Sequence, residues 1–316
     1  MKRNILIMYT DYCPSNSHVE RLNNICKGYN IVKANNEREA IKFAEDAEII
    51  LGHRYLRQVI PYAKKLKWVQ STGGGFDHLP WELLKENSIS LTRVTFSSKI
   101  ISQHAVMLAL ALNRRLPNCI DSQKRKIWDK TIYNQLYPRP RIALIIGLGS
   151  IGRAIAKVLQ AMDIEVWGVK RKKDKESTKV TNRLFVDNTW INEIHKVDFC
   201  FLALPNTSST SNILSEKVLN QMSNKVVIVN IARGELIDLP VLCRLLKEGK
   251  IGGAGLDVFN DRKPLEKDSV LWSTPNLIVT PYLSARYSDR GLDLEEYVES
   301  QVKKYFSGDV LENIVF

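Results

Sequence analysis

A glycine-rich segment at residues 147–152 is the part of this 316-residue sequence whose spacing points most directly to chemistry. It follows the Gly-x-Gly-x-x-Gly pattern and consists of Gly147, Leu148, Gly149, Ser150, Ile151 and Gly152. In such a loop the first glycine permits a tight turn, the second lets the backbone approach a pyrophosphate, and the third lets a helix pack on a strand. The first amides of that helix, including those of Ser150 and Ile151, then face the anion. The spacing predicts a dinucleotide-binding loop, with a ligand-free turn as the alternative.

The segments around this loop read as the strand, helix and strand that such a site requires. Residues 142–146 predict a buried strand, residues 153–162 carry apolar side chains at helical spacing, and residues 165–169 predict a second strand. Further strands are expected within 199–205, 225–232, 252–259 and 277–283, and a helix between Asp238 and Gly249. This alternation predicts an α/β fold with a parallel sheet covered by helices on both faces.

The end of the second strand distinguishes between the two nicotinamide dinucleotides. An acidic side chain there accepts hydrogen bonds from the ribose of NAD. Here Lys170 and Arg171 follow the strand, with two further lysines after them, and we expect no carboxylate that would repel a 2′-phosphate. An arginine can pair with a phosphate through two hydrogen bonds. The sequence favours NADP(H) over NAD(H); the alternative is that these cations lie in solvent and NAD(H) binds through other contacts.

The first hundred residues have a different pattern. Short apolar runs at 5–8, 49–51 and 68–69 alternate with polar helical stretches such as 38–47, which predicts a small βα layer. Residues 100–116 are then largely apolar and predict a helix buried in a core or in a subunit interface. The length of the chain suits two domains.

Composition and charge exclude several classes of protein. Hydrophobic residues make up 44% and charged residues 25%, as in globular proteins, and no apolar run approaches the roughly 18 residues of a membrane helix. Five cysteines without a close pair, together with histidines that lack metal-type spacing, predict neither disulfides nor a metal site and favour a reduced, cytoplasmic setting. The net charge of +12 attracts anions, but the basic cluster at 170–175 lacks aromatic residues, so we expect no nucleic-acid partner.

Six motifs in order identify a family resemblance that covers nearly the whole chain. They are STGGGFDHLP (71–80), GLGSIG (147–152), LPNTSST (204–210), NIARGELID (230–238), GAGLDVF (253–259) and VTP (279–281). Together they resemble the D-isomer-specific 2-hydroxyacid dehydrogenases, which include glyoxylate/hydroxypyruvate reductases and phosphoglycerate dehydrogenases. The resemblance implies a Rossmann dinucleotide-binding domain at 99–283, inserted into a flavodoxin-like substrate domain made of 1–98 and 284–316. It also implies a homodimer built around the apolar helix that begins near Ile100.

The same resemblance assigns roles to residues that match the motifs. Arg233 corresponds to the arginine that binds the substrate carboxylate and polarises the carbonyl, a role that suits a guanidinium. Gly74 and Gly75 correspond to amides that bind the same carboxylate, although a plain turn is the alternative for both. The positions implied for cofactor contacts in these motifs are Pro205, Thr210, Ala232 and Asp257, the last toward the nicotinamide amide.

Two departures affect the residues that exchange the proton. The family's glutamate position is occupied by Arg262 or Lys263, depending on the direction of counting, and the family's histidine position is occupied by Tyr282. A tyrosine hydroxyl is protonated at neutral pH and can donate a proton, so reduction should dominate over oxidation. His104, on the apolar helix, borders the active site in the family, although a packing histidine is the alternative reading.

We therefore expect an NADPH-preferring oxidoreductase that reduces a small 2-oxo acid or a related carbonyl, with Arg233 and Tyr282 as catalytic residues. The alternative is a pseudoenzyme that binds dinucleotide without turnover and has a regulatory or structural role. In that case Tyr282 only fills space.

Overall fold

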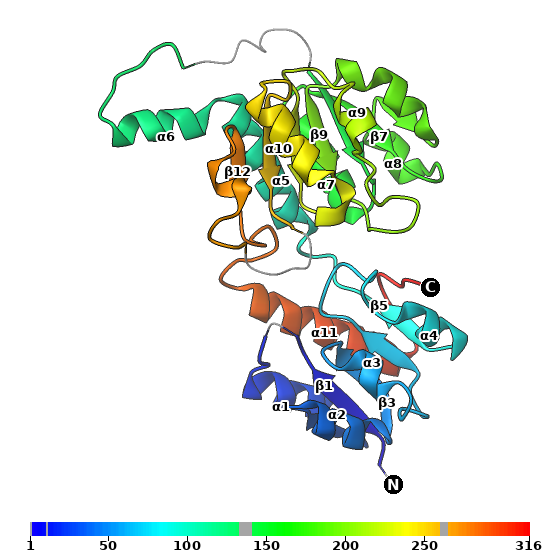
Figure 1. Cartoon of the computed structure of the whole chain (residues 1–316). Helices are drawn as coiled ribbons and strands as arrows, with labels where there is room; N and C mark the ends of the chain where they lie inside the picture. Colours follow the sequence, from blue (N-terminus) through cyan, green and yellow to red (C-terminus); the bar gives the residue numbers. More distant parts are fainter. Residues whose placement is uncertain (1, 11, 133–140, 260–264) are drawn as a thin grey trace. The chain divides into compact units, whose positions relative to one another are not determined.

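The computed structural model of the chain describes residues 2–10, 12–132, 141–259 and 265–316. The chain divides into two compact units, which Figure 1 shows coloured along the sequence. Unit 1 comprises Met1–Ser97 and Tyr287–Phe316, and unit 2 comprises Ser98–Arg286. Each unit contains its own parallel sheet, so the predicted α/β class is confirmed. Among the described helices, none has both the length and the apolar character needed to span a bilayer.

Unit 2 is built on a seven-stranded sheet with the order β12-β11-β10-β9-β6-β7-β8. Its strands are β6 (Ile142–Ile146), β7 (Glu165–Val169), β8 (Arg183–Phe185), β9 (Phe199–Leu202), β10 (Val227–Asn230), β11 (Gly253–Leu256) and β12 (Leu277–Val279). All except the three-residue β8 fall in segments that the sequence predicted as strands. The strands β6 and β9 are neighbours. On one side β6 is followed by β7 and β8, and on the other side β9 is followed by β10, β11 and β12. This is the topological switch point at which dinucleotides bind to such sheets, outside the carboxyl ends of the strands.

Alternate residues of these strands face two separate hydrophobic clusters. On β6, Leu144 and Ile146 belong to one cluster, while Ala143 and Ile145 belong to the other. Helices cover both faces, with α5 (Ser98–Asn113) and α7 (Ser150–Gln160) on one and α9 (Glu216–Leu219) and α10 (Leu239–Lys247) on the other (Figure 1). Strands buried on both faces explain why the sequence shows continuous apolar runs rather than alternation.

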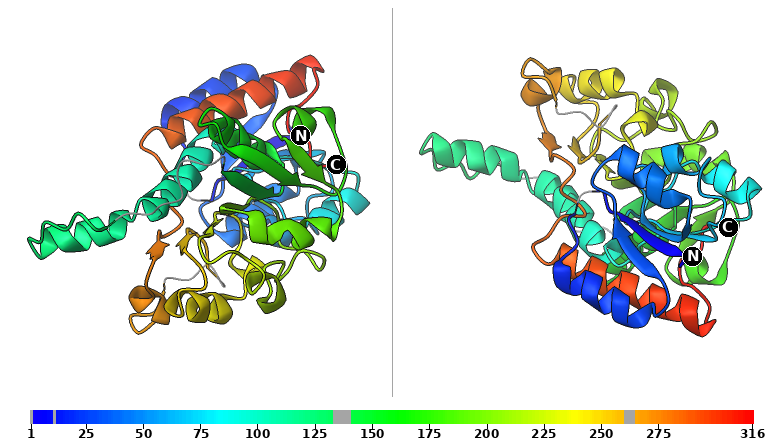
Figure 2. Two further views of the ribbon diagram at one scale, coloured as in Figure 1. Left: turned by 90° about the horizontal axis from the view of Figure 1, so that it is seen from above. Right: turned by 90° about the horizontal axis from the view of Figure 1, so that it is seen from below.

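The apolar helix expected at 100–116 is α5, and it ends earlier than predicted. The helix stops at Asn113, Arg115 has a left-handed backbone with φ of 55°, and α6 (Leu116–Lys124) starts directly afterwards. Pro117 explains the break, because it has no N–H to bond the carbonyl of Asn113 and its ring would clash with that turn. Figure 2 shows α6 leaving the body of unit 2 as a separate helix.

Two glycines of β11 let α5 approach the sheet closely. A Cβ atom at Gly253 would lie 3.2 Å from Cδ2 of Leu112, and one at Gly255 would lie 3.0 Å from Cβ of Leu108. Larger residues at either strand position would therefore push the helix away from the strand. The two leucines are four residues apart, about one helical turn, and the two glycines are two residues apart, which is the repeat of a strand face. Successive leucines on one face of α5 therefore contact successive glycines on one face of β11.

Unit 1 contains a five-stranded sheet with the order β2-β1-β3-β4-β5, the flavodoxin-like order. Its strands are β1 (Asn4–Met8), β2 (Asn30–Lys33), β3 (Ala47–Gly52), β4 (Trp68–Gln70) and β5 (Ser90–Thr92). Its helices are α1 (Asn16–Ile25), α2 (Glu37–Ala44), α3 (Leu56–Val59), α4 (Trp81–Glu86) and α11 (Arg290–Ser307). The predicted βα layer at the start of the chain is confirmed, and α11 joins it from the end of the chain.

Helix α11 completes one of the cores of unit 1. Its side chains Leu294, Val298 and Val302 are buried in the cluster that also contains Leu22 of α1 and Trp68 of β4. Without α11, one face of the unit 1 sheet would expose this cluster to water.

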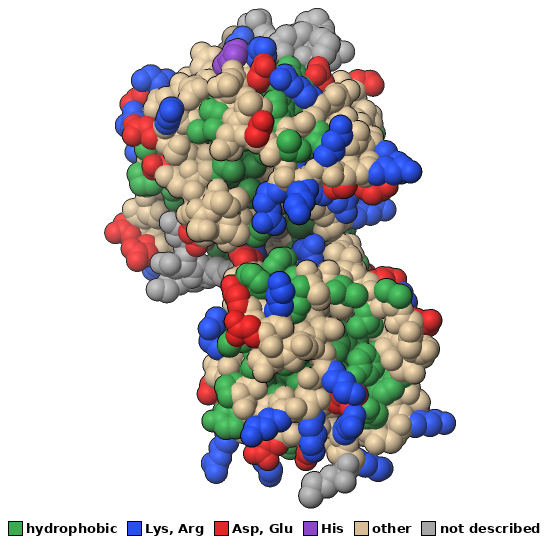
Figure 3. All heavy atoms as spheres, turned by 90° about the vertical axis from the view of Figure 1, so that its right-hand side faces the viewer, with side chains coloured by type: hydrophobic (Ala, Val, Ile, Leu, Met, Phe, Trp, Pro, Cys, Tyr) green, Lys and Arg blue, Asp and Glu red, His purple; other side chains and the backbone are tan. Residues whose placement is uncertain are grey.

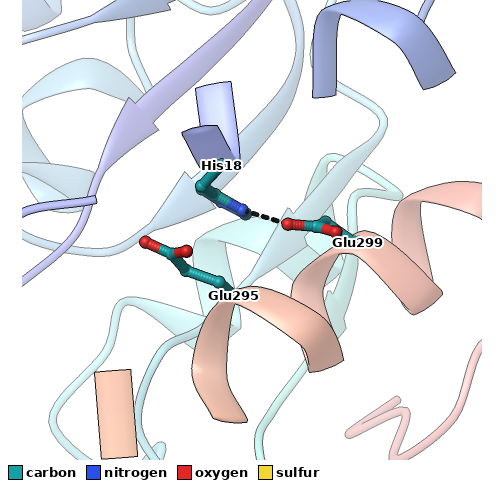
Figure 4. Close-up of side chains that lie close together, drawn as sticks. All are labelled: His18, Glu295 and Glu299. Atoms are coloured by element: carbon teal, nitrogen blue, oxygen red, sulfur yellow. Dashed lines mark hydrogen bonds and ion pairs between the residues drawn. The ribbon is translucent and has the colours of Figure 1, made fainter. Parts of the chain in front are cut away.

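A buried polar network also fastens α11 to α1. The Nδ1 atom of His18 lies 2.6 Å from a Glu299 carboxylate oxygen (Figure 4). Its Nε2 atom lies 2.8 Å from the Tyr9 hydroxyl. Arg21 donates to Glu299 at 2.9 Å and to Glu295 at 3.1 Å. Within the described residues, His18, Glu295 and Glu299 form the one group whose ligand atoms are close enough for a metal ion. Arg21 pairs with both carboxylates, so an ion network accounts for the arrangement.

Basic side chains are not gathered into one patch on the face shown in Figure 3. Lysine and arginine side chains are scattered over that face, with acidic side chains between them. This distribution is that of an ordinary solvated surface.

Candidate active site

The glycine-rich loop connects β6 to α7, as predicted. Gly147 has φ of +99°, and a Cβ atom there would lie 2.5 Å from the carbonyl oxygen of Ala203. A Cβ atom at Gly152 would lie 1.9 Å from the carbonyl oxygen of Gly147. Around Gly149, by contrast, no other described part of the protein lies within 4 Å of such an atom. The chain's own packing thus requires the first and third glycines, whereas the space beside the second is open to an approaching ligand.

The start of α7 lies at this open position. Gly149 is the N-cap of the helix and provides no side-chain cap, so Ser150 and Ile151 begin the helix with backbone amides that no cap occupies. Arg153, one turn further, donates from Nη1 to the carbonyl oxygen of Leu148 at 3.0 Å. This cation beside the loop was not singled out from the sequence, although it follows the last glycine of the motif directly.

The cations after β7 have a neighbour that the sequence analysis did not anticipate. Lys170 forms an ion pair with Asp174, whose other carboxylate oxygen accepts a 2.8 Å hydrogen bond from the amide of Ser177. The Lys170 side chain holds the pKa of Asp174 well below its usual range, so the carboxylate is charged at neutral pH. The expectation that no carboxylate lies at this strand end is wrong, because Asp174 caps the following helix, α8 (Lys175–Lys179), and so turns back toward Lys170. Arg171 is exposed and has no ion-pair partner in the described ranges.

The loop after β9 is fixed by its own hydroxyl groups. Thr210 donates to the carbonyl oxygen of Pro205 at 2.7 Å and accepts from the amide of Thr207 at 2.9 Å. Because β9 pairs with β6, this loop begins beside the glycine-rich loop. Pro205 and Thr210 therefore belong to the same edge of the sheet as the open position at Gly149.

The loop after β10 is held by a buried asparagine that the sequence analysis missed. Asn230 donates to the carbonyl oxygen of Arg233 at 2.6 Å and accepts from the amide of Ala232 at 3.0 Å. Arg233 is half-buried and donates to the carbonyl oxygen of Ala232 at 2.6 Å. The side chain of Asn230 thus fixes the backbone from which Arg233 extends.

Asp257 joins the ends of β11 and β12. Its buried carboxylate accepts hydrogen bonds from Thr280 Oγ1 at 2.6 Å, from the Leu283 amide at 2.8 Å and from the Ser284 amide at 3.0 Å. The amide of Asp257 in turn donates to the carbonyl oxygen of Asn230 at 3.0 Å. Asp257 is therefore an organising residue of this edge, a role that no sequence motif revealed.

Tyr282 has an unusual backbone and a hydroxyl group that is already engaged. Its φ of 55° lies in the left-handed region, which is strained for a bulky residue. Its hydroxyl donates to the carbonyl oxygen of Phe259 at 2.8 Å and accepts from the amide of Phe259 at 3.1 Å. To act as a general acid it would have to leave the Phe259 carbonyl, so that role stays a prediction. Arg262 and Lys263 lie outside the described residues.

His104 reaches the same group from α5. Its Nε2 atom lies 3.1 Å from Thr280 Oγ1 and 3.6 Å from Asp257 Oδ1, and its side chain is 14% exposed. One histidine, one carboxylate and one hydroxyl therefore meet at the carboxyl ends of β11 and β12.

In unit 1, Gly74 and Gly75 lie in the loop that follows β4. Arg93 donates to the carbonyl oxygen of Gly74 at 2.9 Å, and Ser71 accepts from the amide of Gly73 at 3.1 Å. Among the described backbone–backbone hydrogen bonds, none is donated by the amide of Gly74 or Gly75.

These features define a Rossmann-type unit with a glycine-rich loop at the switch point of its sheet. Residues 106–284 match the family model "D-isomer specific 2-hydroxyacid dehydrogenase, NAD binding domain". Since this match covers more than half of the chain, the protein belongs to the D-isomer specific 2-hydroxyacid dehydrogenase family.

Relatives of known name agree with this assignment. The D-3-phosphoglycerate dehydrogenase of Methanocaldococcus jannaschii is 32% identical over 284 residues, which cover 88% of this chain and 53% of that protein. The glyoxylate reductase of Pyrococcus horikoshii is 26% identical over 283 residues, which cover 87% and 84% of the two chains. This chain spans about half the length of the phosphoglycerate dehydrogenases that it matches.

Solved structures show the same fold. A D-isomer specific 2-hydroxyacid dehydrogenase family protein from Aeromonas salmonicida has a TM-score of 0.79 and 27% identity, with 100% of this chain and 99% of that chain covered. An NADPH-dependent glyoxylate/hydroxypyruvate reductase from Sinorhizobium meliloti, in complex with NADP and malonate, has a TM-score of 0.78 and 23% identity, with coverage of 100% and 97%. At that identity the second structure supports the fold alone.

Proposed function

We propose that this protein is a nicotinamide-dependent reductase of a small 2-oxo acid or a related carbonyl compound, with NADPH as the preferred cofactor. The observation that carries the proposal is the open space at Gly149, at the start of α7 and at the switch point of the sheet. A pyrophosphate is the ligand for which such a position is suited. When bound, the reduced nicotinamide supplies the hydride.

The cofactor preference rests on Arg171 more than on Lys170. Arg171 is exposed and can pair with a 2′-phosphate, whereas Lys170 is shared with Asp174. We therefore assign the phosphate contact to Arg171, with Lys170 as a second cation. The expected result is a dissociation constant for NADPH at least about tenfold below that for NADH, or about 1.4 kcal/mol. Fluorescence titration of both cofactors measures it, and equal affinities would remove the assignment.

Arg233 is the proposed ligand of the substrate carboxylate. Asn230 holds its backbone, so the guanidinium extends from a fixed point at the carboxyl end of β10. A guanidinium can hold a carboxylate and polarise the adjacent carbonyl at the same time. The substrate-binding role of Gly74 and Gly75 in unit 1, which the family resemblance implies, stays a prediction.

The remaining cofactor contacts are assigned to the loops along this edge. Pro205, Thr210 and Ala232 border the dinucleotide in the proposal, and Asp257 contacts the nicotinamide amide. The Oδ2 atom of Asp257 accepts one described hydrogen bond, from Ser284, and can accept another.

The decisive experiment measures NADPH consumption with a panel of 2-oxo acids that includes glyoxylate and hydroxypyruvate. Arg233→Ala should lower kcat/KM by at least about 100-fold for any active substrate, while NADPH affinity stays within twofold. Arg244→Ala is the matched control, because that arginine lies on α10 and pairs with Glu216 on the surface. Activity of Arg233→Ala within a fewfold of the wild type would exclude it from the site.

One observation favours the second candidate, a dinucleotide-binding protein without turnover. The Tyr282 hydroxyl, which the family resemblance assigns to the position of the family's histidine, is bound to the backbone of Phe259. This candidate predicts tight cofactor binding and no NADPH consumption with any carbonyl compound tested.

A homodimer is the proposed assembly. Apolar side chains of α6 and the following residues are exposed in the single chain, namely Leu116, Ile120, Ile127 and Trp128. Trp128 alone is 88% exposed, which is unusual for a large aromatic residue. Sedimentation of the wild type should give twice the chain mass, and Ile120→Lys combined with Trp128→Lys should give the monomer. A wild-type monomer at micromolar concentration would contradict the proposal.

A further inference from the structure

The reduction of a carbonyl requires a proton as well as a hydride, and this chain lacks the family's usual donor. Tyr282 donates its hydroxyl proton to Phe259, as described above. The described structure also places the imidazole of His104 at this edge, and an imidazole can act as a general acid. We propose that His104, held by Asp257 and Thr280, donates the proton in the reduction; this inference rests on the proposed reductase function.

The position of His104 follows from the packing of α5 on β11. Leu112, Leu108 and His104 are spaced by four residues along one face of the helix, and four residues advance about 6.0 Å. Gly253, Gly255 and Asp257 are spaced by two along one face of the strand, which advances about 6.6 Å. Leu112 packs against the backbone of Gly253, and Leu108 packs against that of Gly255. In the same series, His104 lies against Asp257. The two glycines bring the helix close enough for the imidazole to reach the carboxylate.

The hydrogen bonds determine which nitrogen of His104 is protonated. The carboxylate of Asp257 can only accept, so Thr280 donates its hydroxyl proton to it at 2.6 Å. Thr280 Oγ1 must then accept from His104, and the Nε2 atom at 3.1 Å carries that proton. The Nδ1 atom has no partner in the described part of the chain, so in the imidazolium its proton is the one available to a substrate.

Asp257 and Thr280 therefore act on His104 as positioning residues. They fix the tautomer and the orientation of the ring, as a carboxylate does for a catalytic histidine in a triad. The carboxylate of Asp257 lies 3.6 Å from the Nε2 atom of the ring. The imidazole is 14% exposed, which leaves a route for water to return the proton.

The step balances with the cofactor already proposed. The carbonyl carbon of the substrate accepts a hydride from the reduced nicotinamide, the C=O π bond breaks, and its electron pair moves to oxygen. That oxygen takes the Nδ1 proton of His104, and the product is a hydroxy acid. The neutral imidazole that remains takes a proton from water, so no further reactant is needed.

The test compares His104→Gln with Tyr282→Phe and with a control histidine. Glutamine keeps a donor that can reach Thr280 but has no titratable proton, so the fold should persist while kcat falls about 10²-fold or more. NADPH affinity should stay within twofold. His195→Gln is the matched control, since His195 is exposed in the 3₁₀ segment η1 (Asn188–Lys196) and should leave kcat unchanged.

A second readout separates a proton donor from a structural residue. The decline of kcat/KM at high pH should share its midpoint with the titration of His104 followed by NMR in the cofactor-free protein. The resonance is assigned among the five histidines by its loss in His104→Gln. Added imidazole should restore part of the activity of His104→Ala, and a larger part at lower pH.

Three results would overturn the inference while the wild type is an active reductase. They are a wild-type kcat in folded His104→Gln, a 10²-fold loss in Tyr282→Phe alone, or a pH profile unaffected by replacing His104. A wild type that binds NADPH but reduces no carbonyl compound would instead refute the proposed function, and this inference with it.

Discussion

Gly149→Ala provides a test of dinucleotide binding that is separable from folding. The residue has φ of −72°, which alanine adopts without strain, and its added methyl group would meet no described atom within 4 Å. Two opposing effects on stability are expected. Alanine reduces the entropy of the unfolded chain by about 0.4–1 kcal/mol, but it is a poorer N-cap than glycine by a comparable amount. The free energy of unfolding should therefore change by less than about 1 kcal/mol.

The same methyl group would project into the space that the pyrophosphate needs. We expect NADPH and NADH to bind at least about tenfold more weakly to Gly149→Ala, a loss of about 1.4 kcal/mol for each. The loss should be equal for both cofactors, because the pyrophosphate is common to them. Fluorescence titration gives the affinities, and urea denaturation of the same samples gives the stability.

Alanine at either neighbouring glycine of the loop serves as a control, because it should reduce the stability of the fold, whereas Gly149→Ala should reduce cofactor binding. A methyl group at Gly152 would overlap the carbonyl oxygen of Gly147, and one at Gly147 would overlap that of Ala203. Both contacts are with backbone, so each variant should lose about 3 kcal/mol or more of stability. If Gly149→Ala binds both cofactors within twofold of the wild type, or loses as much stability as these controls, the assignment of Gly149 as the pyrophosphate contact is refuted.

Three other outcomes follow from named contacts. Asp174→Asn keeps the cap of α8 but removes the charge beside Lys170, so NADPH should bind severalfold more tightly and NADH should change little in the same titration. Gly255→Ala would press a methyl group against Leu108, so urea denaturation should show a loss of about 1–3 kcal/mol. Burial raises the pKa of Glu295, but hydrogen bonds from its neighbours outweigh this effect and hold the pKa below its ordinary value of 4.5. The charged carboxylate therefore stabilises the fold above pH 4.5, and this stability is lost as the pH falls below 4.5. Thermal unfolding between pH 7 and pH 3 should show this loss, and Glu295→Gln should reduce the dependence.

The architecture was accessible from the sequence because it is encoded in local patterns. The buried strand at 142–146, the glycine spacing and the Asp238 cap each involve residues close together in the chain, and the structure contains all three. The end of α5 was predicted too late because the predicted segment extended to the apolar Leu116, although Asn113, Arg114 and Arg115 already interrupt the apolar run and Pro117 disfavours a helix beyond Asn113.

The contacts within the candidate site were less accessible because they join distant segments. His104 and Asp257 are 153 positions apart, and only the packing of α5 on two glycines of β11 brings them together. The Asp174 pair had a local signal that was overlooked, because an aspartate directly before a short helical stretch is a typical N-cap. Whether Asp174 also pairs with Lys170 depends on the conformation of the chain between the two residues, which the composition of the segment does not specify.

The division of unit 1 across the sequence has a consequence during protein synthesis. The first 97 residues leave the ribosome long before α11, whose Leu294, Val298 and Val302 complete their core. At about 5–20 residues per second, roughly 10–40 s pass before Val302 is made. Throughout that interval the nascent sheet presents an apolar face that includes Trp68, while unit 2 can already fold as a continuous segment. The nascent chain is therefore most vulnerable to aggregation in its oldest part, and a chaperone that shields the early βα layer would protect it until translation ends.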